Sequence, residues 1–140
     1  MLRLLSAIVV IGAVALGFVL LSGSSFSGAP TLAARSNDDA GVRVVVTPKV
    51  LGPGLSVWEF EVVMDTHTKP LNENLTQVSV LVDVSGGRHT PVDWQGDPPG
   101  GHHRKGVLKF TALAEMPKAV ELHIDRIGGA GTRTFRWELE

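Results

Sequence analysis

The pattern of apolar and polar positions predicts β-structure for most of the chain. From Gly41 onward, short apolar runs alternate with clusters of Gly, Pro, Asn and Asp. In the run SVWEFEVVM, every second residue from Trp58 to Met64 is apolar, and the glutamates between them fall on the opposite face. The last run, TFRWELE, repeats this pattern with Phe135, Trp137 and Leu139 on one face. This period of two is typical of half-buried antiparallel strands.

Similar runs predict seven strands, and no stretch after Leu21 sustains a helical period. About seven short strands in about a hundred residues, separated by turn residues, favour a single immunoglobulin-like antiparallel β-sandwich, an all-β fold. Trp58, Trp94 and Trp137 are in phase with apolar neighbours two positions away, so all three are expected in its core. The predicted strands are residues 42–46, 56–64, 77–83, 90–94, 107–110, 120–124 and 134–138.

The N-terminus predicts contact with a membrane. Residues 1–21, MLRLLSAIVVIGAVALGFVLL, contain Arg3 and then an uncharged stretch, residues 4–21. As a helix this stretch is about 27 Å long, close to the roughly 30 Å hydrocarbon core of a bilayer. We therefore expect an N-terminal hydrophobic helix, either a signal anchor or a signal peptide. The positive charge in front of it favours a cytoplasmic N-terminus and an exported remainder.

These features predict three segments. Residues 1–21 are the signal anchor or signal peptide, residues 22–40 are a flexible linker rich in Ser, Gly and Ala, and residues 41–140 are the sandwich. The protein is expected in the cell membrane, with a single span through residues 4–21 and an extracytoplasmic domain. If the segment is cleaved, a secreted or periplasmic protein results.

Composition narrows the classes of function. The 13 Lys and Arg residues balance 14 Asp and Glu residues, so the chain lacks the basic surface expected for nucleic-acid binding. The absence of cysteine excludes disulfides, thiolate catalysis and cysteine-ligated metals. There is no G-x-S-x-G, no phosphate-binding loop and no H-E-x-x-H motif. The sequence therefore predicts neither an enzyme nor a resident cofactor.

Candidate binding residues collect in three of the predicted loops. If successive strands are antiparallel, the loops after the second, fourth and sixth strands emerge at the same end of the sandwich. The three loops carry Asp65 and His67, then Asp97, His102 and His103, then the glycine-rich residues 128–131.

The other two histidines are not candidates. Strand phase places His123 on the solvent-facing side, and His89 follows a turn without an evident acidic neighbour.

Asp65, His67, His102 and His103 are candidate metal ligands, because imidazole and carboxylate groups are ligands that zinc and Cu(II) prefer. Their spacing is not a zinc-site signature. Adjacent residues of an extended chain point in opposite directions, so the two neighbouring histidines can share an ion only if the glycines at 100–101 kink the backbone.

The alternative for the same residues is structural. Asp65 would cap a turn, His67 would form a hydrogen bond to the neighbouring loop, and one of the paired histidines would pack against Trp94.

The segments VMDTH, LTQVSVLVD and PVDWQGDPPGGHHRKGVLKF together resemble a family of small exported or membrane-anchored proteins. These proteins are uncharacterised, and each is a single immunoglobulin-like β-sandwich with a D-T-H segment and a W-x-G…GGHHR-x-G-x-L-x-F segment. The resemblance covers residues 57–110, roughly half of the predicted domain. It implies that His67 and residues 102–104 are diagnostic of the family, and it implies no activity.

The sequence thus predicts a non-catalytic extracytoplasmic binding or accessory module, tethered to the membrane, with a protein partner in the cell envelope. The alternative is a small periplasmic copper- or zinc-binding protein that uses the loop histidines.

Overall fold

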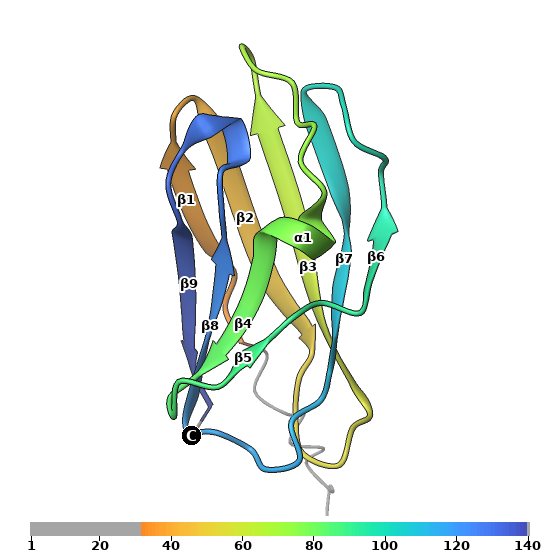
Figure 1. Cartoon of the computed structure of the whole chain (residues 1–140), viewed down its shortest axis with the longest axis vertical. Coiled ribbons are helices and arrows are strands. Elements are labelled where there is room, and N and C mark those ends of the chain that lie inside the picture. Colours follow the sequence, from red (N-terminus) through yellow and green to blue (C-terminus); the bar gives the residue numbers. More distant parts are fainter. Residues whose placement is uncertain (1–31, 140) are drawn as a thin grey trace, which may run out of the picture.

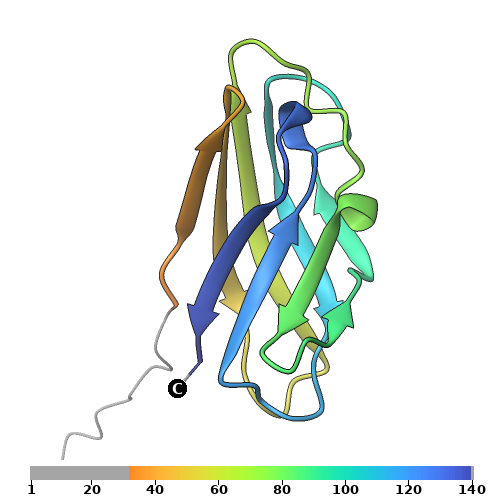
Figure 2. The same cartoon turned by 60° about the vertical axis from the view of Figure 1, so that its left-hand side comes forward.

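A computed structural model describes residues 32–139 as two antiparallel β-sheets packed face to face (Figures 1 and 2). The predicted hydrophobic helix, residues 4–21, lies outside the described residues. Within residues 32–139, no helix has the length and apolar character needed to cross a membrane. The elements are β1 (Arg35–Asp39), β2 (Val42–Val50), β3 (Val57–Thr66), α1 (Leu75–Val78), β4 (Ser79–Asp83), β5 (Arg88–His89), β6 (Asp93–Gly96), β7 (His103–Thr111), β8 (Ala119–Ile124), a 3-10 turn (Ile127–Gly129) and β9 (Arg133–Glu138).

One sheet has five strands and the other has four. The first sheet has the order β1-β2-β3-β7-β6 and the second has the order β5-β4-β8-β9. Every pair of neighbouring strands is antiparallel. The prediction of an all-β antiparallel sandwich is therefore confirmed.

The core follows the predicted alternation of side chains. Every second residue of β3 from Trp58 to Met64 is fully buried, as are Phe135 and Trp137 of β9. The ring of Phe60 contacts Phe110 within its own sheet, at 5.7 Å between centroids, and Trp137 of the opposite sheet, at 5.5 Å. These aromatic contacts join the two layers, because each ring buries a large apolar area.

Trp94 differs from the other two tryptophans. Its register opposite Leu108 places it on the inward face, as its phase predicts. It is only half-buried, because β6 is an edge strand and has a neighbouring strand on one side only.

The strand β1 lies inside the stretch predicted as a flexible linker, so that prediction is wrong for residues 35–39. The strand pairs with β2 through a two-residue turn, in which Ala40 and Gly41 both have positive φ, as type I′ hairpins require. Its sequence, RSNDD, is polar because it forms a sheet edge and buries little apolar area. Periodicity therefore gave no signal for it.

Two other predicted strands begin or divide differently. In the predicted strand 77–83, the first two residues belong instead to the short helix α1. The N-cap of this helix, Asn74, accepts a hydrogen bond from the Thr76 amide at 3.1 Å. The residues 90–94 are not one strand, because Pro91 has no amide hydrogen with which to continue a ladder. The chain instead leaves the second sheet after β5 and enters the first sheet at β6, where the Val92 amide bonds to the Lys109 carbonyl oxygen.

The turn between β4 and β5 is organised by one carboxylate. Asp83 accepts hydrogen bonds from the amides of Ser85 and Gly87, at 2.9 and 3.0 Å, and its second oxygen lies 3.0 Å from Nε2 of His89. The hydrogen bond with His89, followed by those from Ser85 and Gly87, lowers the pKa of Asp83 well below its usual range. His89 thus has an acidic partner, contrary to the expectation from its local sequence.

The substitution Asp83→Asn is expected to lower the melting temperature most at neutral pH. Since the pKa of Asp83 is lowered in the folded state, its ionised form stabilises the fold above its unfolded pKa of about 3.9. This contribution is lost as the pH falls through that value toward the folded pKa. The difference in melting temperature between wild type and Asp83→Asn should therefore shrink below about pH 4.

Circular dichroism melts from about pH 7 to about pH 3 measure this difference. Glu115→Gln, at an exposed loop carboxylate, is the matched control and should change little. A difference for Asp83→Asn that stays constant over this range would contradict the role assigned to its charge.

Candidate functional site

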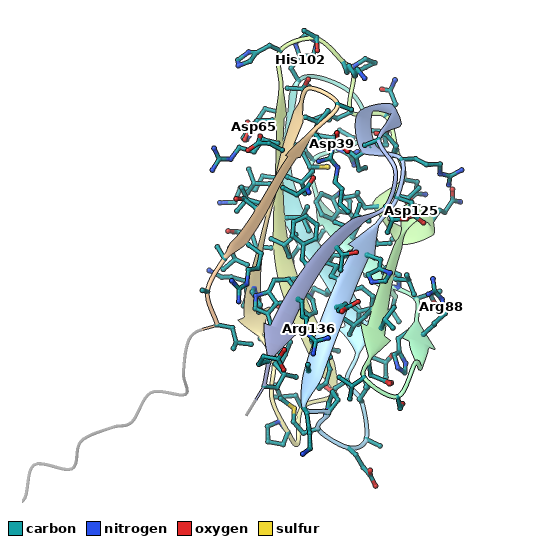
Figure 3. All side chains as sticks on the ribbon, turned by 90° about the vertical axis from the view of Figure 1, so that its left-hand side faces the viewer. Asp39, Asp65, Arg88, His102, Asp125 and Arg136 are labelled. Atoms are coloured by element: carbon teal, nitrogen blue, oxygen red, sulfur yellow. The ribbon has the colours of Figure 1, made fainter. Side chains whose placement is uncertain are left out.

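Four connections meet at one end of the sandwich, here called the histidine pole. They are the β1–β2 turn (residues 40–41), the β3–α1 loop (67–74), the β6–β7 loop (97–102) and the β8–β9 loop (125–132), all at the top of Figure 1. In Figure 3, His102 lies at this end and Arg136 lies toward the other. The prediction that the loops bearing the candidate ligands share one end is therefore confirmed.

Backbone hydrogen bonds fasten the β3–α1 loop to the β6–β7 loop. The Thr66 amide donates to the His102 carbonyl oxygen at 2.9 Å, and the Leu71 amide donates to that of Gly101 at 3.0 Å. The Gly100 amide donates back to the Leu71 carbonyl oxygen at 2.8 Å. Gly100 and Gly101 have φ of 118° and 71°, which glycine adopts without strain. The backbone therefore bends at these two glycines, and the bend serves this pairing of loops.

Side chains fasten the β3–α1 loop to the β8–β9 loop. The ammonium of Lys69 donates to the Gly128 carbonyl oxygen at 2.5 Å, and a carboxylate oxygen of Glu73 accepts from the Gly128 amide at 3.2 Å. A side chain at position 128 would collide with Val42, since an added Cβ would lie 2.4 Å from its methyl carbon. The glycine-rich segment is therefore needed for close packing of the backbone at this pole.

Arg104 is buried at the centre of the histidine pole. Its guanidinium donates to the carbonyl oxygens of Leu71 at 2.9 Å, Glu73 at 2.8 Å and Asp97 at 3.3 Å. Burial lowers the pKa of Arg104, while the negative charges of Glu73 and Asp97 act in the opposite direction. The side chain thus joins both loops through a charged donor that stays protonated in proteins. The resemblance includes Arg104 in its GGHHR segment, and neither the resemblance nor the periodicity predicts this structural role.

The W-x-G and R-x-G segments cover the side chain of this arginine. The Arg104 guanidinium lies 5.7 Å from the centre of the Trp94 ring, within range of a cation–π contact. A Cβ added to Gly106 would lie 2.6 Å from that ring, and one added to Gly96 would lie 3.0 Å from it. Both glycines therefore make room for the ring. It is Arg104, and not one of the paired histidines, that packs against Trp94.

Arg133, at the start of β9, is a second buried arginine. It donates to the carbonyl oxygens of Asp39 at 2.7 Å and Ile127 at 3.3 Å, and to the side-chain oxygen of Asn37. Burial lowers its pKa, and the charges of Asp39 and Asp38 oppose this shift. Arg133 thereby holds the polar strand β1 against the second sheet.

The structure brings two of the four candidate ligands together. Asp65 and His103 are opposite each other on β3 and β7, and Oδ1 of Asp65 lies 2.5 Å from Nδ1 of His103. Both side chains remain exposed, by 51% and 61%. His67 and His102 are exposed in their loops. Within residues 32–139, no three His, Asp or Glu side chains converge closely enough to hold a metal ion.

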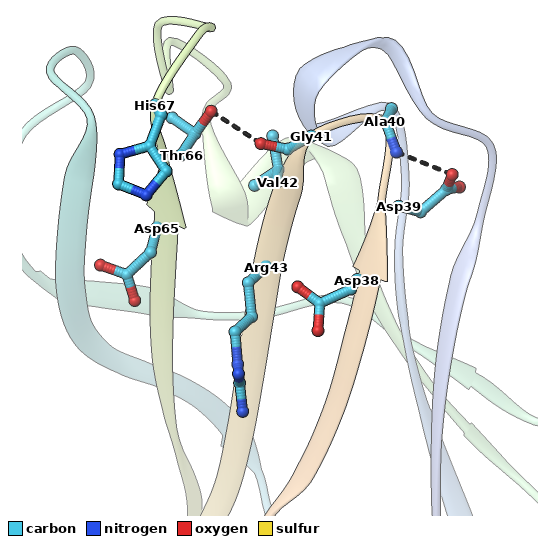
Figure 4. Close-up of a pocket in the computed structure, with 9 residues that line it drawn as sticks. All are labelled: Asp38, Asp39, Ala40, Gly41, Val42, Arg43, Asp65, Thr66 and His67. Atoms are coloured by element: carbon cyan, nitrogen blue, oxygen red, sulfur yellow. Dashed lines mark hydrogen bonds between the residues drawn. The ribbon is translucent and has the colours of Figure 1, made fainter.

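The capping role expected for Asp65 belongs to its neighbour. The hydroxyl oxygen of Thr66 accepts hydrogen bonds from the amides of Thr68 and Lys69, both at 3.3 Å. The same hydroxyl donates to the Gly41 carbonyl oxygen at 2.9 Å, which joins the β1–β2 turn to the pole (Figure 4).

A shallow open depression lies beside this turn (Figure 4). The strand register aligns four charged or ionisable residues in a row across the first sheet. Asp38 is opposite Arg43, Arg43 is opposite Asp65, and Asp65 is opposite His103. All four residues are exposed. The depression is lined by Asp38, Asp39, Ala40, Gly41, Val42, Arg43, Asp65, Thr66 and His67.

Comparison with known proteins assigns no family. No family model and no curated protein matches the chain. The crystal structure of a DUF4426 family protein from Pseudomonas aeruginosa is similar, with 13% sequence identity and a TM-score of 0.45. The aligned region covers 74% of this chain and 90% of that chain. At this level of similarity, function has to be argued from the residues of the chain itself.

The substitution Arg104→Ala is expected to destabilise the protein by about 3 kcal/mol or more, because it removes a buried side chain and its hydrogen bonds to three backbone carbonyl oxygens. Arg43→Ala is the matched control, since this arginine is exposed on the neighbouring face, and should cost about 0.5 kcal/mol or less. Chemical denaturation measures both free energies of unfolding. Equal losses for the two variants would show that Arg104 does not fasten the pole.

Proposed function

We propose that this protein is a non-catalytic extracytoplasmic binding module, which residues 4–21 hold at the membrane and which presents the histidine pole to a protein partner. The observation that carries the proposal is the contrast within this pole. Its loops are fastened by Arg104 and by backbone hydrogen bonds, while His67, His102 and His103 stay exposed. Loops held on a rigid scaffold are where binding residues are commonly found.

The strand order supports an immunoglobulin-like arrangement. The order β2-β3-β7-β6 over β5-β4-β8-β9 corresponds to strands A-B-E-D over C′-C-F-G of that fold. In this correspondence the β3–α1 and β8–β9 loops are the B–C and F–G loops. These two loops belong to the end that binds antigen in antibody variable domains. The correspondence concerns position alone, and it favours the histidine pole as the recognition surface.

The fastened loops also favour binding on energetic grounds. A partner that docks on loops already ordered by Arg104 and the paired backbone avoids the cost of ordering them. The exposed row of Asp38, Arg43 and Asp65 offers alternating charges along one side of the pole. Such alternation favours a partner of complementary charge pattern over one with a single sign of charge.

Site-specific photocrosslinking in the host cells tests this proposal. A photoreactive amino acid at position 102, in the full-length protein, should yield a discrete adduct with an envelope protein. The same residue at position 134, exposed on the outer face of the second sheet, is the control and should yield none. The membrane fraction should retain the adduct after an alkaline wash, since residues 4–21 are proposed to span the bilayer.

Two results would oppose the proposal. An absence of adducts at position 102, or identical adducts at both positions, would contradict recognition by the histidine pole. A soluble product that has lost residues 1–21 would contradict the tether while leaving recognition testable.

Binding of copper or zinc is the second candidate function, and the contact between Asp65 and His103 favours it. His67 lies two positions after Asp65 and lines the same depression, so it is the third ligand that this candidate would use. His102, exposed in the β6–β7 loop, is the remaining candidate ligand.

Metal titration tests this second candidate. If the site is real, Zn(II) or Cu(II) should raise the melting temperature near pH 7.5, and this effect should weaken at lower pH because metal binding requires deprotonated ligands. The variants Asp65→Ala and His103→Ala should abolish the response. His123→Ala is the matched control, because His123 and Glu121 form a comparable pair, 2.9 Å apart, on the other sheet. An equal response in His103→Ala and His123→Ala would contradict the site.

A further inference from the structure

The end of the sandwich opposite the histidine pole is where the described chain begins. We call it the tether pole, and define it by residues 32–34, the β2–β3 loop (51–56), the β4–β5 turn (84–87) and the β7–β8 loop (112–118). The indole of Trp137 donates to the Ala33 carbonyl oxygen at 2.8 Å, which fixes the start of the chain there. From this point β1 runs toward the histidine pole (Figure 2).

The tether pole displays apolar side chains at the tips of all three loops. Leu55 is 42% exposed, Val84 is 55% exposed and Met116 is 36% exposed. Val50, at the end of β2, adds a fourth exposed apolar side chain. The sequences of the three loops contain just two charged residues, Glu115 and Lys118. Apolar side chains gathered at one end of a soluble domain indicate an interaction surface.

Hydrogen bonds hold these tips in place. The carboxylate of Asp83 fixes the turn that carries Val84, through its bonds to Ser85 and Gly87. The indole of Trp58 donates to the Gly52 carbonyl oxygen at 2.9 Å, which fixes the loop that carries Leu55. A shallow depression between the turn and the β7–β8 loop is lined in part by Val84, Leu113, Met116 and Pro117.

We propose that the tether pole rests on the surface of the lipid bilayer, with Leu55, Val84 and Met116 inserted at the boundary between headgroups and acyl chains. This inference depends on the proposed membrane tether. Apolar side chains inserted to a depth of about 5–10 Å are typical of proteins that lie on a membrane surface. Because these loops carry little charge, the contact should not require anionic lipids.

The length of the connection supports the bilayer as the occupant of this surface. Ten residues, 22–31, separate the proposed span from Leu32, and they reach at most about 36 Å when fully extended. A Ser- and Gly-rich chain of this length has a root-mean-square extension of about 16–19 Å. The ten residues of β3 alone are about 33 Å long. At this typical extension, the tether favours the tether pole over the histidine pole as the end nearer to the bilayer.

The absence of cysteine allows a direct measurement of depth. Leu55→Cys, Met116→Cys and His102→Cys, each in the full-length protein, would carry an environment-sensitive fluorophore in phosphatidylcholine vesicles. Lipids with a nitroxide near the top of the acyl chain should reduce the fluorescence at positions 55 and 116 to about half or less, and leave position 102 unchanged. Equal fluorescence loss at all three positions, or none at 55 and 116, would overturn the proposal.

Flotation of the same vesicles separates this inference from the tether. Protein that floats without fluorescence loss at 55 and 116 overturns the lipid contact and leaves the tether intact. Protein that does not float overturns both.

A second copy of the chain is the competing occupant. If the apolar tips are covered by another copy, shielding of positions 55 and 116 from an aqueous quencher should vanish as the protein is diluted in lipid. Shielding that persists on dilution supports the bilayer, and shielding lost on dilution overturns it.

Discussion

The buried guanidinium of Arg104 is the interaction on which the histidine pole depends. A charge placed in the interior is costly unless hydrogen bonds replace its hydration, and here the acceptors are backbone carbonyl oxygens of two loops. The Leu71 and Asp97 carbonyl oxygens also accept from the Gly100 amide and the Trp94 indole, while the Glu73 carbonyl oxygen accepts from the guanidinium. Removing the arginine therefore removes three contacts to the two loops at once. The arginine therefore fixes the loops in one arrangement. The Trp94 ring lies against the guanidinium, and Gly96 and Gly106 leave room for this ring.

A second constraint comes from the strand β1, which Arg133 holds in place. With β1 absent, the chain would enter the sandwich at the histidine pole, where β2 begins. The additional strand reverses the direction of entry and brings the chain in at the opposite pole. For a domain tethered by its N-terminus, this single polar strand separates the attached end from the end that carries the exposed histidines. Anchorage and recognition are thereby proposed to use different poles of one small domain.

The sequence predicted those parts of the fold that depend on alternating burial. Trp58, Phe60 and Trp137 had clear phases, because each faces a core that excludes water. The strand β1 was missed, because its stability comes from Arg133, far away in the sequence, and not from apolar side chains. The division of residues 90–94 was signalled by Pro91, yet which sheet each part joins depends on contacts that no local pattern contains.

The sequence predicted where the candidate residues lie, but not which of them contact each other. Antiparallel order sufficed to gather the loops of His67 and His102 at one pole. The contact of Asp65 with His103 requires the register between β3 and β7, and this register is not encoded in either segment alone. The signal available for Arg104 was an arginine in phase with the inward residues of β7, a position where a charge needs a dedicated set of partners.

Amide hydrogen exchange in the variant Arg104→Met most directly tests whether this arginine orders the histidine pole. The amides of Thr66, Leu71 and Gly100, protected in the wild type by bonds between the loops, should exchange much faster in the variant. Amides of β8 and β9 should keep their protection, because the second sheet does not use Arg104. Unchanged protection of the three loop amides, in a variant that remains folded, would contradict the account.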